Sequence, residues 1–121
     1  SIDTGLTRAV GFSISENRGP TLEDIVFLAL RKREEDIFYY KTAKGYEVDF
    51  YLRRTRELYQ ACWDMSDTET REREVRALIE AQTELKAKEL YIISFDVKED
   101  IVMGENLIKV IPVWEWLLSK S

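Results

Sequence analysis

The fold is decided by the stretch DIFYYKTAKGYEVDFYLRRTRELYQACW, which covers residues 36–63. Residues 36–42 are rich in aromatic and β-branched side chains, and residues 46–53 alternate apolar with polar ones. Both patterns favour β-strands, and the intervening Ala43-Lys44-Gly45 is typical of a hairpin turn. A third strand is expected over residues 58–63, so the stretch predicts three strands that follow one another in a sheet.

The two-residue period of a strand predicts which of these side chains share a face. On the second strand, Val48 and Phe50 are expected to point one way and Asp49 the other. On the third strand, Gln60 and Cys62 lie two residues apart and therefore share a face. Aspartate is depleted within strands, so Asp49 is a candidate for a functional residue.

Helices are expected on both sides of this stretch. Thr21 can cap a first helix, because its hydroxyl can accept a hydrogen bond from an N–H group of the first turn. Ser66, with Glu69 three residues later, predicts the start of a second helix that runs to about Lys86. The remaining expected elements are strands over residues 90–95 and 107–111 and a helix over residues 113–118. This order predicts an α/β fold with a single mixed sheet and flanking helices.

Composition excludes several classes of site. The chain has 121 residues, 45% of them hydrophobic, which suits one domain with a packed core. It has no histidine and a single cysteine, Cys62, which excludes histidine-based triads, an internal disulfide and most zinc sites. Any metal is therefore expected to be a hard cation such as Mg²⁺ or Mn²⁺. The net charge is −5 and no run of about 18 apolar residues occurs, so we expect a cytoplasmic protein that does not bind membranes.

The predicted order of helix, three strands, helix and strand resembles the core of the PD-(D/E)xK nuclease superfamily, the restriction-endonuclease-like αβββαβ fold. The resemblance implies a Glu near the start of the first helix, an Asp on the second strand and a Glu-x-Lys pair on the third. Glu23 and Asp49 match the first two positions, whereas Gln60 and Cys62 stand where Glu and Lys are expected. In that superfamily the carboxylates hold a divalent cation, Mg²⁺ or Mn²⁺, which activates water for phosphodiester cleavage.

A narrower resemblance covers residues 2–118. The chain is similar to the DUF4143 domain at the C-terminus of archaeal-type AAA ATPases, through the segments DTGL, LEDIVFLALRKR, GYEVDF, LYQACWDMSDTETREREVRALIEA and IKVIPVWEWLL in this order. The resemblance implies an upstream ATPase domain of the same polypeptide, and ATP would bind there, since no GxxxxGK[ST] loop occurs here. We therefore expect residues 2–19 to be a residual linker from that upstream region and residues 20–121 to be the nuclease-like domain.

The departures from the superfamily pattern predict a degenerate active site. Gln60 is a neutral amide and Cys62 carries no positive charge, so both metal binding and transition-state stabilisation are weakened. Glu47 is two residues from Asp49 and could supply a substitute carboxylate, which makes Glu23, Asp49 and Glu47 the expected ligands if a metal binds. We interpret Glu23, Asp49, Gln60 and Cys62 as site or relic positions. The plainer interpretation makes Gln60 a satisfied buried amide and Cys62 a small core residue.

Three functions remain open on the sequence. The first is a non-catalytic DNA-binding or protein-contact appendage of an ATPase, and the second is a metal-dependent DNA endonuclease that resembles Holliday-junction resolvases. The third is a dimerisation or regulatory module, such as a homodimer, without nucleic acid. If DNA binds, the basic residues expected to line its groove are Lys41, Lys44, Arg53, Arg54 and Arg56.

Overall fold

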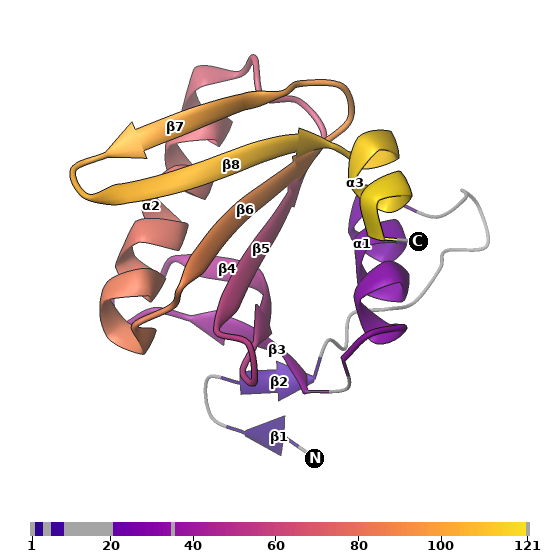
Figure 1. The fold of residues 1–121 in the computed structure, drawn as a ribbon. Helices are drawn as coiled ribbons and strands as arrows, with labels where there is room; N and C mark the ends of the chain where they lie inside the picture. Colours follow the sequence, from indigo (N-terminus) through magenta and orange to yellow (C-terminus); the bar gives the residue numbers. More distant parts are fainter. Residues whose placement is uncertain (1, 4–5, 9–20, 35, 121) are drawn as a thin grey trace.

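The computed structural model describes residues 2–3, 6–8, 21–34 and 36–120, which form one sheet flanked by helices (Figure 1). The helices are α1 (Leu22–Arg31), α2 (Thr68–Leu85) and α3 (Val113–Lys120). The strands are β1 (Ile2–Asp3), β2 (Leu6–Arg8), β3 (Ile37–Lys41), β4 (Glu47–Leu52), β5 (Glu57–Cys62), β6 (Glu89–Ser94), β7 (Glu99–Met103) and β8 (Asn106–Pro112). The predicted core order of helix, three strands, helix and strand is present as α1, β3, β4, β5, α2 and β6.

The sheet is mixed, with the strand order β1-β2-β3-β4-β5-β6-β8-β7. Strand β6 is parallel to both of its neighbours, β5 and β8, and the other neighbouring strands are antiparallel. A parallel pair needs a crossover connection, which α2 supplies between β5 and β6. These features confirm the prediction of an α/β fold with a single mixed sheet and flanking helices.

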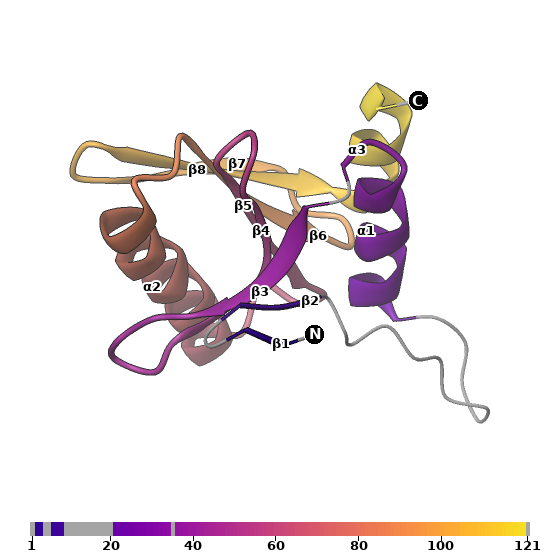
Figure 2. The same cartoon turned by 90° about the horizontal axis from the view of Figure 1, so that it is seen from below.

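The sheet has an apolar core on each face. Helix α2 covers one face, and helices α1 and α3 cover the other (Figure 2). Leu78 of α2 and Ile92 of β6 belong to the first core. Leu30 of α1, Ile93 of β6 and Trp116 of α3 belong to the second. Because the neighbours Ile92 and Ile93 are both fully buried, β6 is apolar without alternation, as the sequence of this segment suggested.

Some elements differ from the sequence-based expectation. Strand β7 pairs with β8 as an antiparallel hairpin and was not predicted, because it begins with two acidic residues. Strand β2 pairs with β3 and lies inside the range expected to be a linker. Residues 9–20 lie outside the described residues, so the linker over residues 2–19 and the domain boundary stay predictions. Within the described part of the chain, no helix combines the length and apolar character needed to cross a membrane.

The helix caps were predicted correctly for one helix and wrongly for the other. Thr21 caps α1 in a capping box, in which its hydroxyl accepts from the Asp24 N–H at 3.2 Å and the Asp24 carboxylate accepts from the Thr21 N–H at 2.9 Å. The prediction that Ser66 caps α2 is wrong. Asp67 is the cap, because its carboxylate accepts from the Thr70 N–H at 3.1 Å and is the stronger acceptor beside the positive end of the helix dipole.

Candidate functional site

A β-bulge in β4 reverses the alternation of side chains at Asp49. The register between β3 and β4 shifts between Phe38 and Tyr40, where β4 has two residues, Asp49 and Phe50, against one in β3. As a result, Val48 packs in the core beneath α2, and Phe50 packs in the core beneath α1 and α3. The prediction that Val48 and Phe50 share a face is therefore wrong, because the extra residue shifts the two-residue period by one.

Hydrogen bonds from side chains replace the backbone hydrogen bonds where β4 and β5 separate. The backbone register of these strands stops before Asp49. The Gln60 side-chain oxygen accepts from the Asp49 N–H at 2.9 Å, and its amide nitrogen donates to the carbonyls of Glu47 at 3.1 Å and Glu74 at 3.4 Å. The Ala61 N–H donates to the Asp49 carboxylate at 2.8 Å. Gln60 has an exposed fraction of 0%, so it is a buried amide with all of its contacts on backbone groups.

Three carboxylates from three elements act on Asp49 electrostatically: Glu23 of α1, Glu47 of β4 and Glu74 of α2. Burial raises the pKa of Asp49 to about 8, and repulsion from Glu23, Glu74 and Glu47 adds to the shift. Burial likewise raises the pKa of Glu74 to about 7, and repulsion from Glu23 adds to it. Glu23 and Asp49, predicted to be site positions, thus lie within electrostatic reach of each other despite their separation in the sequence.

Glu74 is a residue of this site that sequence analysis missed. The charged residues around it favour a solvated helix face, yet Glu74 precedes the buried Leu78 and Ala81 by one and two helical turns. That spacing is the signal that could have identified it. A surface pocket with a volume of about 430 Å³ adjoins the carboxylates, and its lining consists of Gly45, Tyr46, Glu47, Asp49, Arg73 and Glu74.

Cys62 lies at the end of β5 as a neutral buried thiol. Its sulfur is 3.6 Å from the Asp64 carbonyl oxygen, to which it donates. Burial raises the pKa of Cys62 to about 11, and the nearby charge of Glu74 adds to the shift. The described residues contain no group of three or more histidine, cysteine, aspartate or glutamate side chains arranged to hold a metal ion. The assignment of Glu23, Asp49 and Glu47 as metal ligands stays a prediction.

Most of the predicted DNA-contacting residues form ion pairs within this chain. The nitrogen-to-oxygen distances are 3.6 Å for Lys44–Glu80, 3.4 Å for Arg53–Asp36 and 3.6 Å for Arg54–Glu34. Lys41 and Arg56 are exposed. Since a carboxylate stands beside three of the five cations, their combined attraction for phosphate groups is reduced. The role of all five in binding nucleic acid stays a prediction.

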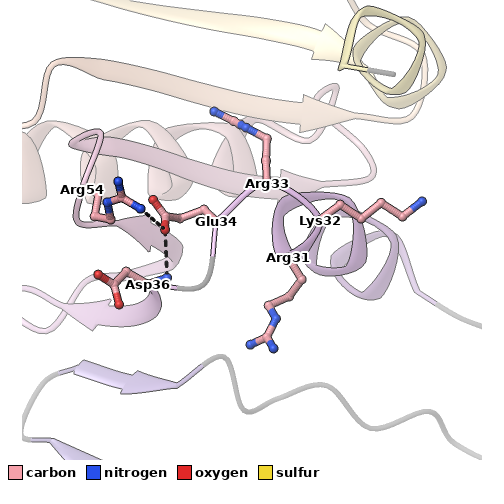
Figure 3. A pocket seen from close by; sticks show the side chains of 6 residues that line it. All are labelled: Arg31, Lys32, Arg33, Glu34, Asp36 and Arg54. Carbon is pink, nitrogen blue, oxygen red and sulfur yellow. Dashed lines mark hydrogen bonds and ion pairs between the residues drawn. The ribbon is translucent and has the colours of Figure 1, made fainter.

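A second pocket, of about 450 Å³, lies at the C-terminal end of α1 and is lined by Arg31, Lys32, Arg33, Glu34, Asp36 and Arg54. Figure 3 shows that the side chains of Arg31, Lys32 and Arg33 point away from one another, and that Arg54 points to Glu34. Arg33 donates to the Glu57 carboxylate at 3.0 Å. Recognition of a phosphate requires donors that converge on one point, and these cations do not converge.

Comparison with known proteins gives the family. The sequence model of the family described as "Domain of unknown function (DUF4143)" matches residues 18–116. This chain belongs to the DUF4143 family. A similar protein, the uncharacterized protein MJ1544 of Methanocaldococcus jannaschii, is 39% identical over 118 residues, in an alignment that covers 88% of this chain and 26% of the relative. The chain thus spans about a quarter of that relative's length. No solved structure matches this chain.

Proposed function

We propose that this DUF4143 domain has a nuclease-like fold without nuclease chemistry and serves as a protein-contact module. The observation that carries the proposal is the hydrogen bonding and burial of the Gln60 side chain. Both ends of its amide bind backbone groups of β4 and α2, and the side chain is fully buried. The position that resembles a metal-binding Glu is therefore occupied by a neutral group that holds two strands and a helix together.

The neighbouring position also lacks the chemistry of a nuclease. A cation is expected there to stabilise charge on the phosphate in the transition state, and loss of one such group typically slows a reaction about 10²–10³-fold. Cys62 supplies a buried thiol, and its raised pKa keeps that thiol neutral at pH 7. The chain has no histidine, so no imidazolium can supply that missing positive charge.

The surface supports a protein partner better than DNA. The net charge is −5, and three of the candidate DNA-contacting cations are paired with carboxylates. Several large apolar side chains are exposed instead: the exposed fraction is 60% for Trp63, 58% for Trp114, 68% for Val102 and 70% for Leu118. A partner protein that covers these side chains would remove their apolar area from water, which favours association.

We place this module in a longer protein that carries an ATPase domain upstream. The support is the resemblance of residues 2–118 to the C-terminal domain of archaeal-type AAA ATPases, together with the much greater length of the M. jannaschii relative. In this arrangement ATP binds the upstream domain, and the DUF4143 domain contributes contacts. Sequencing of the gene upstream of residue 1 tests the arrangement, since a GxxxxGK[ST] loop is expected there.

The test of the proposed function compares the natural chain with Asp49→Ala on a supercoiled plasmid and on a four-way junction, with Mg²⁺ and with Mn²⁺. We expect no cleavage by either protein. Metal-dependent cleavage by the natural chain that disappears in Asp49→Ala would overturn the proposal, because a contaminating nuclease would cut equally in both preparations. A gel-shift series in increasing salt completes the test, since binding that weakens steeply with salt would mark phosphate contacts and a DNA-binding function.

A further inference from the structure

Two aromatic side chains stand side by side where the central parallel strands end. Cys62 and Ser94 form the last pair in the register of β5 and β6, and Trp63 and Phe95 follow them directly. The two rings stack, with centroids 4.3 Å apart and planes inclined by 24°. Parallel register places both rings at the same edge of the sheet, the carboxyl edge, where α/β proteins commonly bind their ligands.

This ring pair is open to solvent. Trp63 is 60% exposed and Phe95 is 46% exposed, whereas the tyrosine stack on the neighbouring part of β5 and β6 includes the fully buried Tyr59. Each exposed aromatic ring leaves apolar area in water at a cost of roughly 25 cal/mol per Å². A partner that covers the rings would recover this free energy on binding.

The charges at this edge are negative. Asp64 follows Trp63 and Asp96 follows Phe95, and both are exposed. Hydrogen bonds from the Ser66 hydroxyl and N–H lower the pKa of Asp64, so its carboxylate is ionised at pH 7. Lys98, two residues after Asp96, forms an ion pair of 2.8 Å with the Glu115 carboxylate, which reduces its attraction for anions. The edge therefore attracts cations and repels phosphate groups.

We propose that the aromatic edge, defined as Trp63, Asp64, Phe95 and Asp96, binds an arginine-bearing basic segment of a partner protein. A guanidinium group is planar and weakly hydrated, so it stacks on an aromatic face while its N–H groups pair with carboxylates. Lysine satisfies the charge but lacks the planar group. The proposal rests on the proposed function as a protein-contact module and names the partner's chemistry.

The first experiment measures peptide binding to the ¹⁵N-labelled chain. The probes are three capped peptides of equal length, in which Gly alternates with Arg, Lys or Glu. We expect the Arg peptide to shift the indole N–H signal of Trp63 in a saturable way, and the Lys peptide to bind several-fold more weakly. The Glu peptide is expected to leave the signal unchanged, and rising salt is expected to weaken the Arg peptide's binding.

Variants separate the charges from the rings. The double change Asp64→Asn and Asp96→Asn removes both charges but leaves an oxygen that can still accept from Ser66, and we expect the Kd of the Arg peptide to rise about fivefold. Phe95→Leu keeps the Trp63 reporter and is expected to weaken binding by a similar factor. The matched control is Leu107→Ser, which removes an apolar side chain of similar exposure from β8 and is expected to leave the Kd unchanged.

Several results would overturn this inference. Equal shifts of the Trp63 signal with the Arg and Glu peptides, or no shift with any peptide, would contradict the proposal of a basic partner. A Trp63 signal that shifts with protein concentration alone would make the occupant a second copy of this chain, and saturable binding of single-stranded DNA at Trp63 would make it a nucleic acid. None of these results changes the outcome of the cleavage assay with Asp49→Ala. Failure of the arginine-binding proposal can therefore be distinguished from failure of the proposal that the domain lacks nuclease activity.

Discussion

Replacement of Gln60 by leucine tests whether this amide holds β4, β5 and α2 together. Leucine has nearly the same volume but leaves the Asp49 N–H and the carbonyls of Glu47 and Glu74 without their partner. A buried backbone group without a partner costs about 1–3 kcal/mol. Two of the three bonds are short, at 2.9 and 3.1 Å, and the third is weak at 3.4 Å. After the apolar gain of leucine, we expect a loss of about 3 kcal/mol in the free energy of unfolding.

Urea denaturation followed by circular dichroism measures this loss as a lower midpoint with an unchanged slope. The matched control is Gln82→Leu, since the Gln82 amide makes one bond of 3.4 Å to the Ala87 carbonyl and is only half-buried. We expect this control to lose less than about 1 kcal/mol. If Gln60→Leu is no more destabilising than Gln82→Leu, the amide is dispensable to the fold, and the reasoning that it has a structural role in place of a catalytic one fails.

Three further predictions concern Asp49, the β7 hairpin and the first helix cap. The pKa of Asp49 is raised to about 8 in the folded chain, so the folded state binds the proton more tightly than the unfolded state, and stability should fall as pH rises from about 4 to 8. Asp49→Asn should flatten that fall in urea titrations at several pH values, and an identical slope in both proteins would contradict the assignment. Glu99→Gln weakens the paired hydrogen bonds from Arg71, so the amides of β7 should exchange hydrogen faster while global stability falls by about 1 kcal/mol or less. Thr21→Ala should cost about 1 kcal/mol in thermal unfolding, and no change in Tm would show that Asp24 caps α1 alone.

Local patterns were enough to predict the elements with strong periodicity. The alternating and aromatic segments gave β3, β4 and β5, and the apolar run Leu90–Ile93 gave the buried β6. Strand β7 was not predicted, because its residues are mostly exposed and it forms only through tertiary pairing with β8. The cap of α2 was displaced by one residue because Ser66 and Asp67 are both good caps, and their competition is decided by geometry.

Some residues of the candidate site could be selected from the sequence, but its geometry could not be predicted. Glu23, Asp49 and Gln60 could be selected because a resemblance supplied the positions. The bulge at Asp49 could not be predicted, because nothing in residues 46–53 interrupts the alternation of apolar and polar side chains. The register shift depends on the pairing of β4 with β3. Glu74 was overlooked because a glutamate in a charged helix is usually solvated, and only the packing of α2 on β4 and β5 buries it.

The parallel pairing of β5 and β6 has a consequence for synthesis on the ribosome. Strands β3, β4 and β5 pair through short local connections and can meet as soon as they emerge, whereas β6 must wait for the whole of α2. Until Ser94 has been translated, β5 exposes an unpaired edge and the side chains of Leu58 and Tyr59, which are fully buried in the finished domain. The nascent chain therefore passes through an interval in which β5 is open to wrong partners, and a pause in translation between Thr68 and Ser94 would lengthen that interval.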